Sequence, residues 1–416
     1  MIAVDRAVEA AWRIEGPRIV AALARMTGDF AQAEDVAQEA LAEALVSWRS
    51  TGIPRNTGAW LTATAKRRAI DAWRRRERLD ERHRALAQEL SETVEQDWEP
   101  IEDDLLRLIF TACHPALSRE SQIALTLRVV GGLTTGEIAR MLLVPVATVQ
   151  ARITRAKKTL AAARVPFESP DPSEWGPRLG GVMGVVYLVF TEGYAATSGD
   201  RWTRADLADE ALRLGRVLCG LLPREPEAHA LVALMEFQRS RFAARATASG
   251  DAILLADQDR RRWDHAQIAR GKAALRRADE LARSRGKSRG AYALQAAIAE
   301  QHSIASRVDE TDWGTIVVLY EALARTAPSP VVDLNRAVAV SMATGPATAL
   351  RIVDELDAGG QLRGSALLPS VRGELLAQLG RGAEARAAFE AAIALTVNEP
   401  QRRVLQAKLD RLTADA

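Results

Sequence analysis

The residues most clearly suited to binding chemistry lie between Gly132 and Arg164, in the stretch GLTTGEIARMLLVPVATVQARITRAKKTLAAAR. The pattern predicts a short helix, a break at a proline and a second helix whose far end is basic. When such a second helix enters the major groove of DNA, residues near its start reach base edges and basic residues further along meet phosphates. The outward positions with this chemistry are Thr148, Gln150, Arg152, Arg155, Lys157 and Lys158.

The two helices of this stretch must hold that face outward. Thr134 and Glu137 have the spacing of a capping box, which starts the first helix. Pro145 fits the first turn of the second helix, because proline lacks an N–H and fixes φ. Apolar residues at helical spacing form the buried side of the pair: Ile138, Met141, Leu142, Val149, Ile153 and Leu160. An ordinary packed helical hairpin without DNA contacts explains the same pattern. This stretch alone therefore does not distinguish a DNA-binding helix pair from a structural one.

Charge is unevenly distributed along the chain, although the net charge is only +2. Residues 66–84 carry about two bases for each acid, and residues 150–164 carry five bases and no acid. Between them, residues 88–105 hold eight acids and no base. Two basic patches separated by an acidic segment suggest a nucleic-acid binder with two contact sites. Solvated helix faces and a disordered acidic linker are the alternative.

Composition favours helices throughout the 416 residues, because Ala, Leu, Arg and Glu dominate and aromatic residues make up only 5%. We expect an all-α protein of several domains. The longest apolar run is too short to span a bilayer, and Cys113 and Cys219 form no CxxC pair. These features predict a cytoplasmic chain with no membrane contact. The histidines show no metal-binding spacing and no catalytic motif is present, so we expect no enzyme activity, no metal and no cofactor.

Proline and glycine divide the chain into helical regions. Residues 10–76 form one helical unit, interrupted by the loop STGIPRNTG, and a second unit runs from about 103 to 164. Four prolines in residues 165–177 then precede a long helical region. Near its end, two segments superpose at a spacing of roughly 36 residues, with Ala349 over Ala385 and Val353 over Phe389. This period approaches that of a tetratricopeptide repeat, although any pair of helical hairpins would look similar.

Several phrases together carry a family resemblance: AEDVAQEAL, AWLTATAKRRAIDAWRR and RITRAKK, in that order, with a linker before the last. The chain resembles the extracytoplasmic-function sigma factors of the sigma-70 family, over roughly residues 10–164. Later phrases, among them VYLVFTEGY and SPVVDLNRAVAV, resemble the long C-terminal extension of one subgroup. The resemblance implies a region 2 domain at 1–76, an acidic linker at 77–102, a region 4 domain at 103–165 and a helical extension at 166–416. It also implies binding to core RNA polymerase and to promoter DNA.

The resemblance assigns roles to residues of the first unit. In AEDVAQEALAEAL, an outward polar stripe corresponds to the family's docking surface for the polymerase: Asp35, Gln38, Glu39 and Glu43. The loop STGIPRNTG and the basic helix after it correspond to the part that contacts the unpaired -10 element, with Arg55, Asn56, Trp60, Lys66, Arg67 and Arg74. The helix-turn-helix residues named above correspond to contacts with the -35 element. A solvated acidic face and a core position for Trp60 are the alternatives at these sites.

The extension has no counterpart in the small sigma core. The resemblance implies that it regulates the core in cis, and repeat-like helices suit a protein or small-molecule partner. Its densest polar cluster, Asp257–His265, could hold a ligand, act as a metal-like carboxylate group or form an ion-pair network. Two hypotheses compete with this interpretation of the whole chain: a one-component helix-turn-helix regulator with a C-terminal sensing domain, and an enzyme fused to a DNA-binding module.

Overall fold

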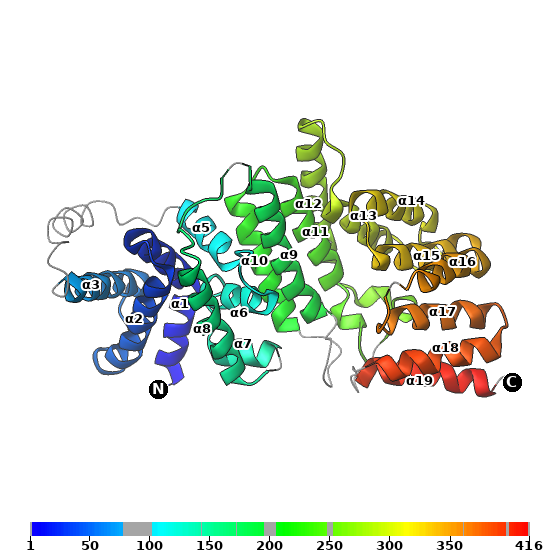
Figure 1. Cartoon of the computed structure of the whole chain (residues 1–416), viewed down its shortest axis with the longest axis horizontal. Helices are drawn as coiled ribbons and strands as arrows, with labels where there is room; N and C mark the ends of the chain where they lie inside the picture. The colour runs from blue at the N-terminus through cyan, green and yellow to red at the C-terminus, as the bar shows by residue number, and fades with distance from the viewer. Residues whose placement is uncertain are drawn as a thin grey trace. The chain divides into compact units, whose positions relative to one another are not determined.

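The computed structural model describes residues 2–77, 102–142, 144–171, 173–194, 205–247, 253–360, 362–396 and 399–414. These residues form helices and connecting turns without a β-strand, which confirms the predicted all-α class (Figure 1). The chain forms two compact units, Met1–Leu188 and Val189–Ala416. None of the described helices is long and apolar enough to cross a membrane. The expected acidic linker at 77–102 falls almost entirely outside the described residues.

The first unit begins with three helices, α1 (Ile2–Thr27), α2 (Phe30–Thr51) and α3 (Thr57–Glu77). Helix α1 packs on both others. Gly28, at φ +66°, provides the turn between α1 and α2 that a residue with a side chain adopts only with strain. The side chain of Asp29 then caps α2 by accepting a hydrogen bond from the Gln32 amide at 3.0 Å. Trp48 and Leu61 are fully buried in the core of this helical group.

The next four helices form a second helical group within the first unit. They are α5 (Glu102–Ala112), α6 (Arg119–Val129), α7 (Thr135–Leu142) and α8 (Val146–Ala162). Helix α8 packs on α6 and α7, and α5 packs on α6 and α1. Their buried apolar residues include Leu125, Leu133, Ile138 and Val149, each fully shielded from solvent. The core of this group therefore lies on the inner side of α8 and leaves its other side exposed.

Helix α9 (Trp175–Tyr194) starts within the first unit, which differs from the boundary expected at residue 166. The ring of Trp175 packs on the ring of Phe110 in α5, with centroids 5.1 Å apart. The guanidinium of Arg178 donates a hydrogen bond to the carbonyl of Phe110 at 3.2 Å. The first turn of α9 therefore packs on α5.

After the end of α9, the second unit continues with α10 (Ala205–Leu221), α11 (Pro226–Arg239), α12 (His265–Ser284) and α13 (Ala291–Ile304). Helix α11 contacts the other three helices (Figure 1). It contributes the fully buried Phe237. Gly271 of α12 permits this close packing, since a β-carbon there would lie 2.9 Å from the Phe237 ring. Buried Glu236 of α11 pairs with Arg216 at 2.5 Å and with Arg270 at 3.2 Å. These contacts fasten α10 and α12 to the central helix.

Six further helices follow in series: α14 (Trp313–Thr326), α15 (Pro330–Thr344), α16 (Pro346–Ala358), α17 (Leu367–Gln378), α18 (Gly382–Leu395) and α19 (Glu399–Ala414). Each packs on the next, and α15 also contacts α17. The positions superposed in the sequence are buried at matching places, because Ala349 and Val353 of α16 and Ala385 and Phe389 of α18 are all at most 1% exposed. The helix pairs α15–α16 and α17–α18 therefore use equivalent packing positions.

Candidate nucleic-acid and protein interfaces

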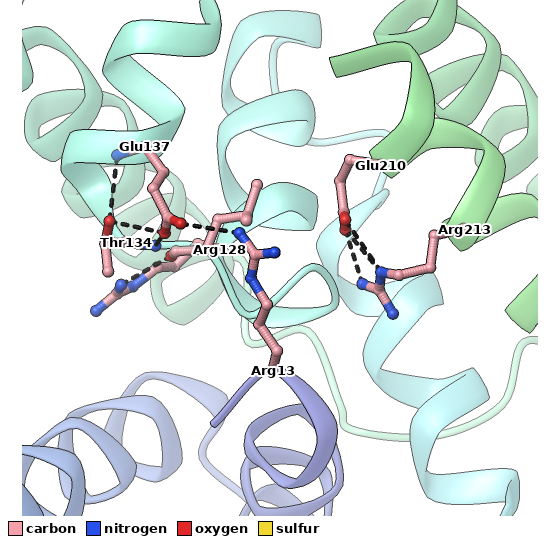
Figure 2. A network of polar contacts seen from close by, with 7 residues as sticks. Arg13, Arg128, Thr134, Glu137, Glu210 and Arg213 are labelled. Carbon is pink, nitrogen blue, oxygen red and sulfur yellow. Dashed lines mark hydrogen bonds and ion pairs between the residues drawn. The ribbon is translucent and has the colours of Figure 1, made fainter. Parts of the chain in front are cut away.

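The helix-turn-helix begins with the predicted capping box. The backbone amide and hydroxyl of Thr134 donate to Glu137 Oε2 at 2.8 and 2.9 Å, and the Glu137 amide donates to Thr134 Oγ1 at 3.1 Å. Figure 2 shows this pair together with Arg13 of α1, whose guanidinium reaches the other carboxylate oxygen at 2.8 Å. Burial would raise the pKa of Glu137, but the hydrogen bonds of Thr134 and the charge of Arg13 lower it below its ordinary value. The capping box is confirmed, and it is joined to another helix.

The second helix starts one residue later than expected. Pro145 has ψ 147°, an extended conformation, and is the residue before α8 instead of part of its first turn. The predicted stripe of Val149, Ile153 and Leu160 is buried, as is Ala156. Proline here ends the turn and leaves the first amides of α8 without a side-chain cap.

The opposite side of α8 is open to solvent over most of its length. Gln150, Arg155 and Lys158 are exposed, and Thr148 and Arg152 are half-buried. Thr154, which the sequence analysis missed, is exposed as well, and its spacing of four from Gln150 and Lys158 could have identified it. These polar and basic residues share a solvent-facing helix side, which we call the α8 face: Thr148, Gln150, Arg152, Thr154, Arg155 and Lys158.

Lys157 does not belong to that face, so the expectation that it points outward is wrong. Its ammonium pairs with the carboxylate of Glu34, and it donates to Asp35 Oδ1 at 2.6 Å, both on α2. The Lys157 side chain is only 16% exposed. Burial disfavours its charge, but the two carboxylates outweigh burial and raise the pKa of Lys157. Lys157 therefore joins α8 to α2.

Arg128 of α6 makes a second link of the same kind. Its guanidinium donates to Gln38 of α2, and its Nε lies 3.5 Å from Glu34. It also donates to the carbonyl of Leu133 at 2.9 Å, so it supports the turn before α7. Neither Arg128 nor Glu34 was predicted as a functional residue, because a contact between residues so far apart in the chain leaves no local sequence pattern.

All four residues of the expected docking stripe have partners within the chain. Asp35 and Gln38 contact Lys157 and Arg128 as described above. Glu39 accepts from Arg68 at 2.8 Å, and Glu43 accepts from Arg68 at 2.7 Å and from Arg67 at 2.6 Å. The hydrogen bond to Glu43, together with that to Glu39, raises the pKa of Arg68. The stripe is an acidic surface neutralised by bases from α3, α6 and α8.

The residues expected to contact the -10 element occupy different environments. Arg55 is exposed, whereas Asn56 caps α3 by accepting from the Ala59 amide at 2.9 Å. Trp60 is half-buried and lies edge-on to Trp48, with centroids 5.5 Å apart. Lys66 is half-buried and Arg67 is exposed on α3, whereas the side chain of Arg74 falls outside the described residues. Arg55 and Arg67 thus remain the most accessible cations of this group.

Residues of the polar cluster Asp257–His265 make hydrogen bonds that hold helices of the second unit. Buried Arg260 donates to the carbonyls of His302 and Ala305 at 2.8 Å each and holds the end of α13. Asp264 caps α12 through the Gln267 amide at 3.0 Å. No group of three or more His, Cys, Asp or Glu that could hold a metal occurs within the described residues. The cluster therefore joins helices of the second unit by hydrogen bonds.

Comparison with known proteins bears on these surfaces. Residues 12–79 match the model of sigma-70 region 2, and residues 107–160 match that of sigma-70 region 4. Residues 178–279 match a family of unknown function, DUF6596. An uncharacterized protein of Rhizobium meliloti (strain 1021) is 44% identical over 411 residues, covering 96% of this chain and 94% of that protein.

The matched segments coincide with the helical groups that carry the two surfaces. Region 2 covers most of α1, all of α2 and α3, and region 4 covers most of α5 together with α6, α7 and nearly all of α8. Such domains indicate a transcription factor that binds RNA polymerase and promoter DNA. The chain therefore belongs to the sigma-70 family, as a sigma factor of the extracytoplasmic-function type with a helical C-terminal extension.

Proposed function

We propose that this sigma factor directs initiation from a two-element promoter and that the α8 face reads the upstream, -35 element. The observation that carries the proposal is the exposed polar and basic side of α8 in a capped helix-turn-helix. Gln150 lies in the first turns, where a side chain reaches base edges, and Arg155 and Lys158 lie further along, where cations meet phosphates. Lys157 joins the -35 contacts only after leaving its partners on α2.

We assign contact with the -10 element to α3 and to the loop before it. Arg55 and Arg67 are exposed cations, and the half-buried Trp60, whose ring lies edge-on to Trp48, falls between them in the sequence. Cations and an aromatic ring attract the phosphates and bases of an unpaired strand. In this proposal the amide of Asn56 keeps its capping role while the neighbouring Arg55 contacts DNA.

Core RNA polymerase is assigned to the α2 stripe of Asp35, Gln38, Glu39 and Glu43. The stripe is acidic and lies on one regular helix, so it offers a rigid line of acceptors to a basic partner surface. Transcription by bacterial polymerase takes place in the cytoplasm, and the proposed function places the chain there.

The C-terminal extension is proposed to regulate the sigma core in cis, as a brace. Support comes from α9, whose first part packs on Phe110 of α5 through Trp175 and Arg178. A connection packed in this way favours an extension that holds region 4 in place. The helix pairs α15–α16 and α17–α18 would form tetratricopeptide-like repeats, a suitable surface for a protein or small-molecule partner.

A pull-down with purified core RNA polymerase tests the assignment of the stripe. The full chain is expected to bind the core enzyme. A chain with Glu39→Lys and Glu43→Lys is expected to bind at least about tenfold more weakly, because each new lysine would face the basic partner surface of the polymerase. Glu384→Lys, at an exposed acid on α18, is the control. Equal binding by the stripe variant and the control would move the docking surface elsewhere.

A further inference from the structure

The second unit contains a pocket beside the connection between α13 and α14. Residues 258–261 line it together with residues 306–309 of that connection. Its volume is about 420 Å³, which is within the usual range for a small-molecule site. The lining is almost entirely polar and charged, so a ligand held here must be polar as well.

Two buried side chains of this pocket carry polar atoms that lack a hydrogen-bond partner. Gln258 and Arg260 are each only 7% exposed. The terminal nitrogens of Arg260 donate to the end of α13 and to Thr311, but within the described part of the chain its Nε has no partner. The Gln258 amide nitrogen donates to a backbone carbonyl at 3.2 Å, whereas its Oε1 has no partner among the described residues. An unpaired buried polar atom is costly, so these two atoms are suited to meet a ligand.

A second buried guanidinium adds positive charge next to Arg260. Arg241 is 7% exposed, and its guanidinium carbon lies 5.9 Å from the ring centroid of Trp263, while that of Arg260 lies 5.2 Å from the same centroid. Neither arginine forms an ion pair with a carboxylate of the residues that the structure describes. Burial, followed by the charge of Arg241, lowers the pKa of Arg260. Because a guanidinium stays charged in proteins, two buried ones without a counter-charge favour a bound anion.

The carboxylates around the pocket do not supply that counter-charge. Asp259 pairs with Arg261 at 2.9 Å and Asp309 pairs with Arg307 at 3.1 Å, so these charges cancel two by two. Glu310 accepts a hydrogen bond from a backbone amide at 3.2 Å and is exposed. Water screens exposed charges far more than buried ones. The buried guanidiniums therefore determine the sign of the field in the pocket.

We propose that this pocket binds a small molecule through an oxyanion, either a phosphate or a carboxylate group. An oxygen of the anion accepts a charge-assisted hydrogen bond from Arg260 Nε, and Gln258 Oε1 accepts from a hydroxyl or amine of the same ligand. Arg260 also holds the end of α13, so the ligand joins residues 258–261 to the connection that precedes the helices α14–α19. The extension thereby has a site for a chemical signal, and this site does not depend on the function proposed for the sigma core.

Hydrogen exchange of the full chain tests the pocket with two probes, inorganic phosphate and succinate. Each probe is compared with sodium chloride at equal ionic strength and pH. Exchange should slow in residues 258–263 and 305–311, by about threefold when the probe concentration is twice its dissociation constant, because only the closed form binds. Exchange in α18 should not change. Protection by phosphate alone assigns a phosphate group, protection by succinate alone assigns a carboxylate, and either supports the oxyanion site.

Two charge variants locate the bound anion. Asp309→Asn removes a carboxylate of the pocket lining and should tighten probe binding by about twofold to fivefold, the usual scale for an exposed charge. Ser306→Asp adds a carboxylate to the lining and should weaken binding by a similar factor. Glu384→Gln breaks an exposed ion pair on α18 and changes the net charge as much as Asp309→Asn, so it is the matched control with wild-type binding. Arg260 is left intact because it also holds α13.

Two results would overturn the proposal. One is a wild-type chain in which neither probe gives saturable protection of residues 258–263 and 305–311, and this result does not depend on how any variant folds. The other is wild-type binding in both Asp309→Asn and Ser306→Asp, with unchanged exchange in α11 to show that they fold, because the anion then lies elsewhere. Neither polymerase nor DNA enters the measurement, so the pocket and the proposed sigma function stand or fall separately.

Discussion

Arg155 and Arg152 have the same chemistry but different surroundings, and the difference decides how each can act on DNA. Arg155 is exposed on α8, whereas Arg152 is half-buried. Hydrogen bonds from its own backbone amide and from Ser118 lower the pKa of Glu120, and the nearby charge of Arg152 adds to that effect. A free guanidinium can contact either a base or a phosphate, and a side chain that is partly held pays less ordering entropy when it reads a base.

We expect Arg152→Ala and Arg155→Ala each to weaken -35 recognition by about 1–3 kcal/mol where the arginine contacts a base. A phosphate contact would instead give a loss that is independent of sequence and a salt slope smaller by about one. Promoter binding by the holoenzyme, measured against salt, separates these cases. Arg276→Ala, at an exposed arginine on α12, is the control. Wild-type affinity and salt slope in both variants would exclude these contacts.

Glu137 links the capping box to Arg13, so removing its side chain should lower the stability of the fold. We expect Glu137→Ala to lower the free energy of unfolding by about 1 kcal/mol at pH 7, the usual scale of a lost capping interaction. The folded-state pKa is depressed below the ordinary 4.5, so this contribution is present above pH 4.5 and is lost as the pH falls through the lower folded value.

Urea unfolding of wild type and Glu137→Ala at several pH values measures the contribution of Glu137 to stability. The difference between their free energies of unfolding should shrink as the pH falls below 4.5. A difference that stays constant with pH would show that the carboxylate charge contributes nothing. Glu137→Gln should keep the capping hydrogen bonds and lose only the ion pair.

His302 at the end of α13 makes the second unit sensitive to acid. Burial, followed by the charges of Arg241 and Arg260, lowers the pKa of His302 from 6.5 to about 3. The unfolded chain therefore binds a proton between these values while the folded chain does not, and stability falls as the pH falls through this window. The expected slope is about 1.4 kcal/mol per pH unit. His302→Gln should remove this slope in denaturant unfolding, and an unchanged slope would contradict it.

Among the elements, α8 shows what local pattern can and cannot reveal. Its buried stripe, its capping box upstream and most of its exposed face follow from periodicity and were predicted correctly. Lys157 was not, although it is four residues after Ile153 and so lies at the edge of the stripe. Lys157 is shielded only because it pairs with carboxylates of α2, which lie more than a hundred residues earlier in the chain. Asn56 before Thr57 is a recognisable capping residue, and its position next to the DNA-binding candidates obscured that role.

The helix pairs of the extension allow a prediction at the same scale. Phe389 of α18 is 1% exposed and packs against Gly373 of α17, where a β-carbon would lie 2.9 Å from its ring. We expect Phe389→Ala to cost about 3–5 kcal/mol and to open α17–α19 first, because stacked helix pairs depend on their neighbours. Hydrogen exchange should show faster exchange in these helices and unchanged exchange in α11. Uniform loss of protection throughout the second unit would contradict a repeat-like organisation.

For the molecule as a whole, the order of the domains could be predicted from the sequence but the end of the first unit could not. Four prolines suggested a domain boundary at residue 166, yet the first unit extends to Leu188, and Trp175 within it packs on Phe110. A contact between two aromatic residues so distant in sequence has no periodicity to reveal it.

Two truncations chosen from this contact distinguish an extension that holds region 4 in place, a brace, from one that covers the DNA-binding helix, a mask. A chain ending at Arg164 loses Trp175 and uncovers Phe110, whereas a chain ending at Tyr194 keeps all of α9. The brace predicts that the chain ending at Arg164 transcribes less than the full chain and that the chain ending at Tyr194, which keeps the contact, retains more of the activity; a mask predicts that both truncated chains transcribe more. Unchanged activity in a folded, polymerase-binding chain would show that the extension exerts no control in cis.

The central claim, that this chain is a promoter-specific sigma factor, is tested most directly by reconstituted run-off transcription. Core RNA polymerase from a related bacterium is supplied with the full chain and a library of genomic promoter fragments. We predict discrete transcripts that require the chain and that decrease sharply with the double variant Arg152→Ala and Arg155→Ala, while Arg276→Ala leaves them unchanged. Active core enzyme that yields no chain-dependent transcript from any promoter in the library would contradict the account.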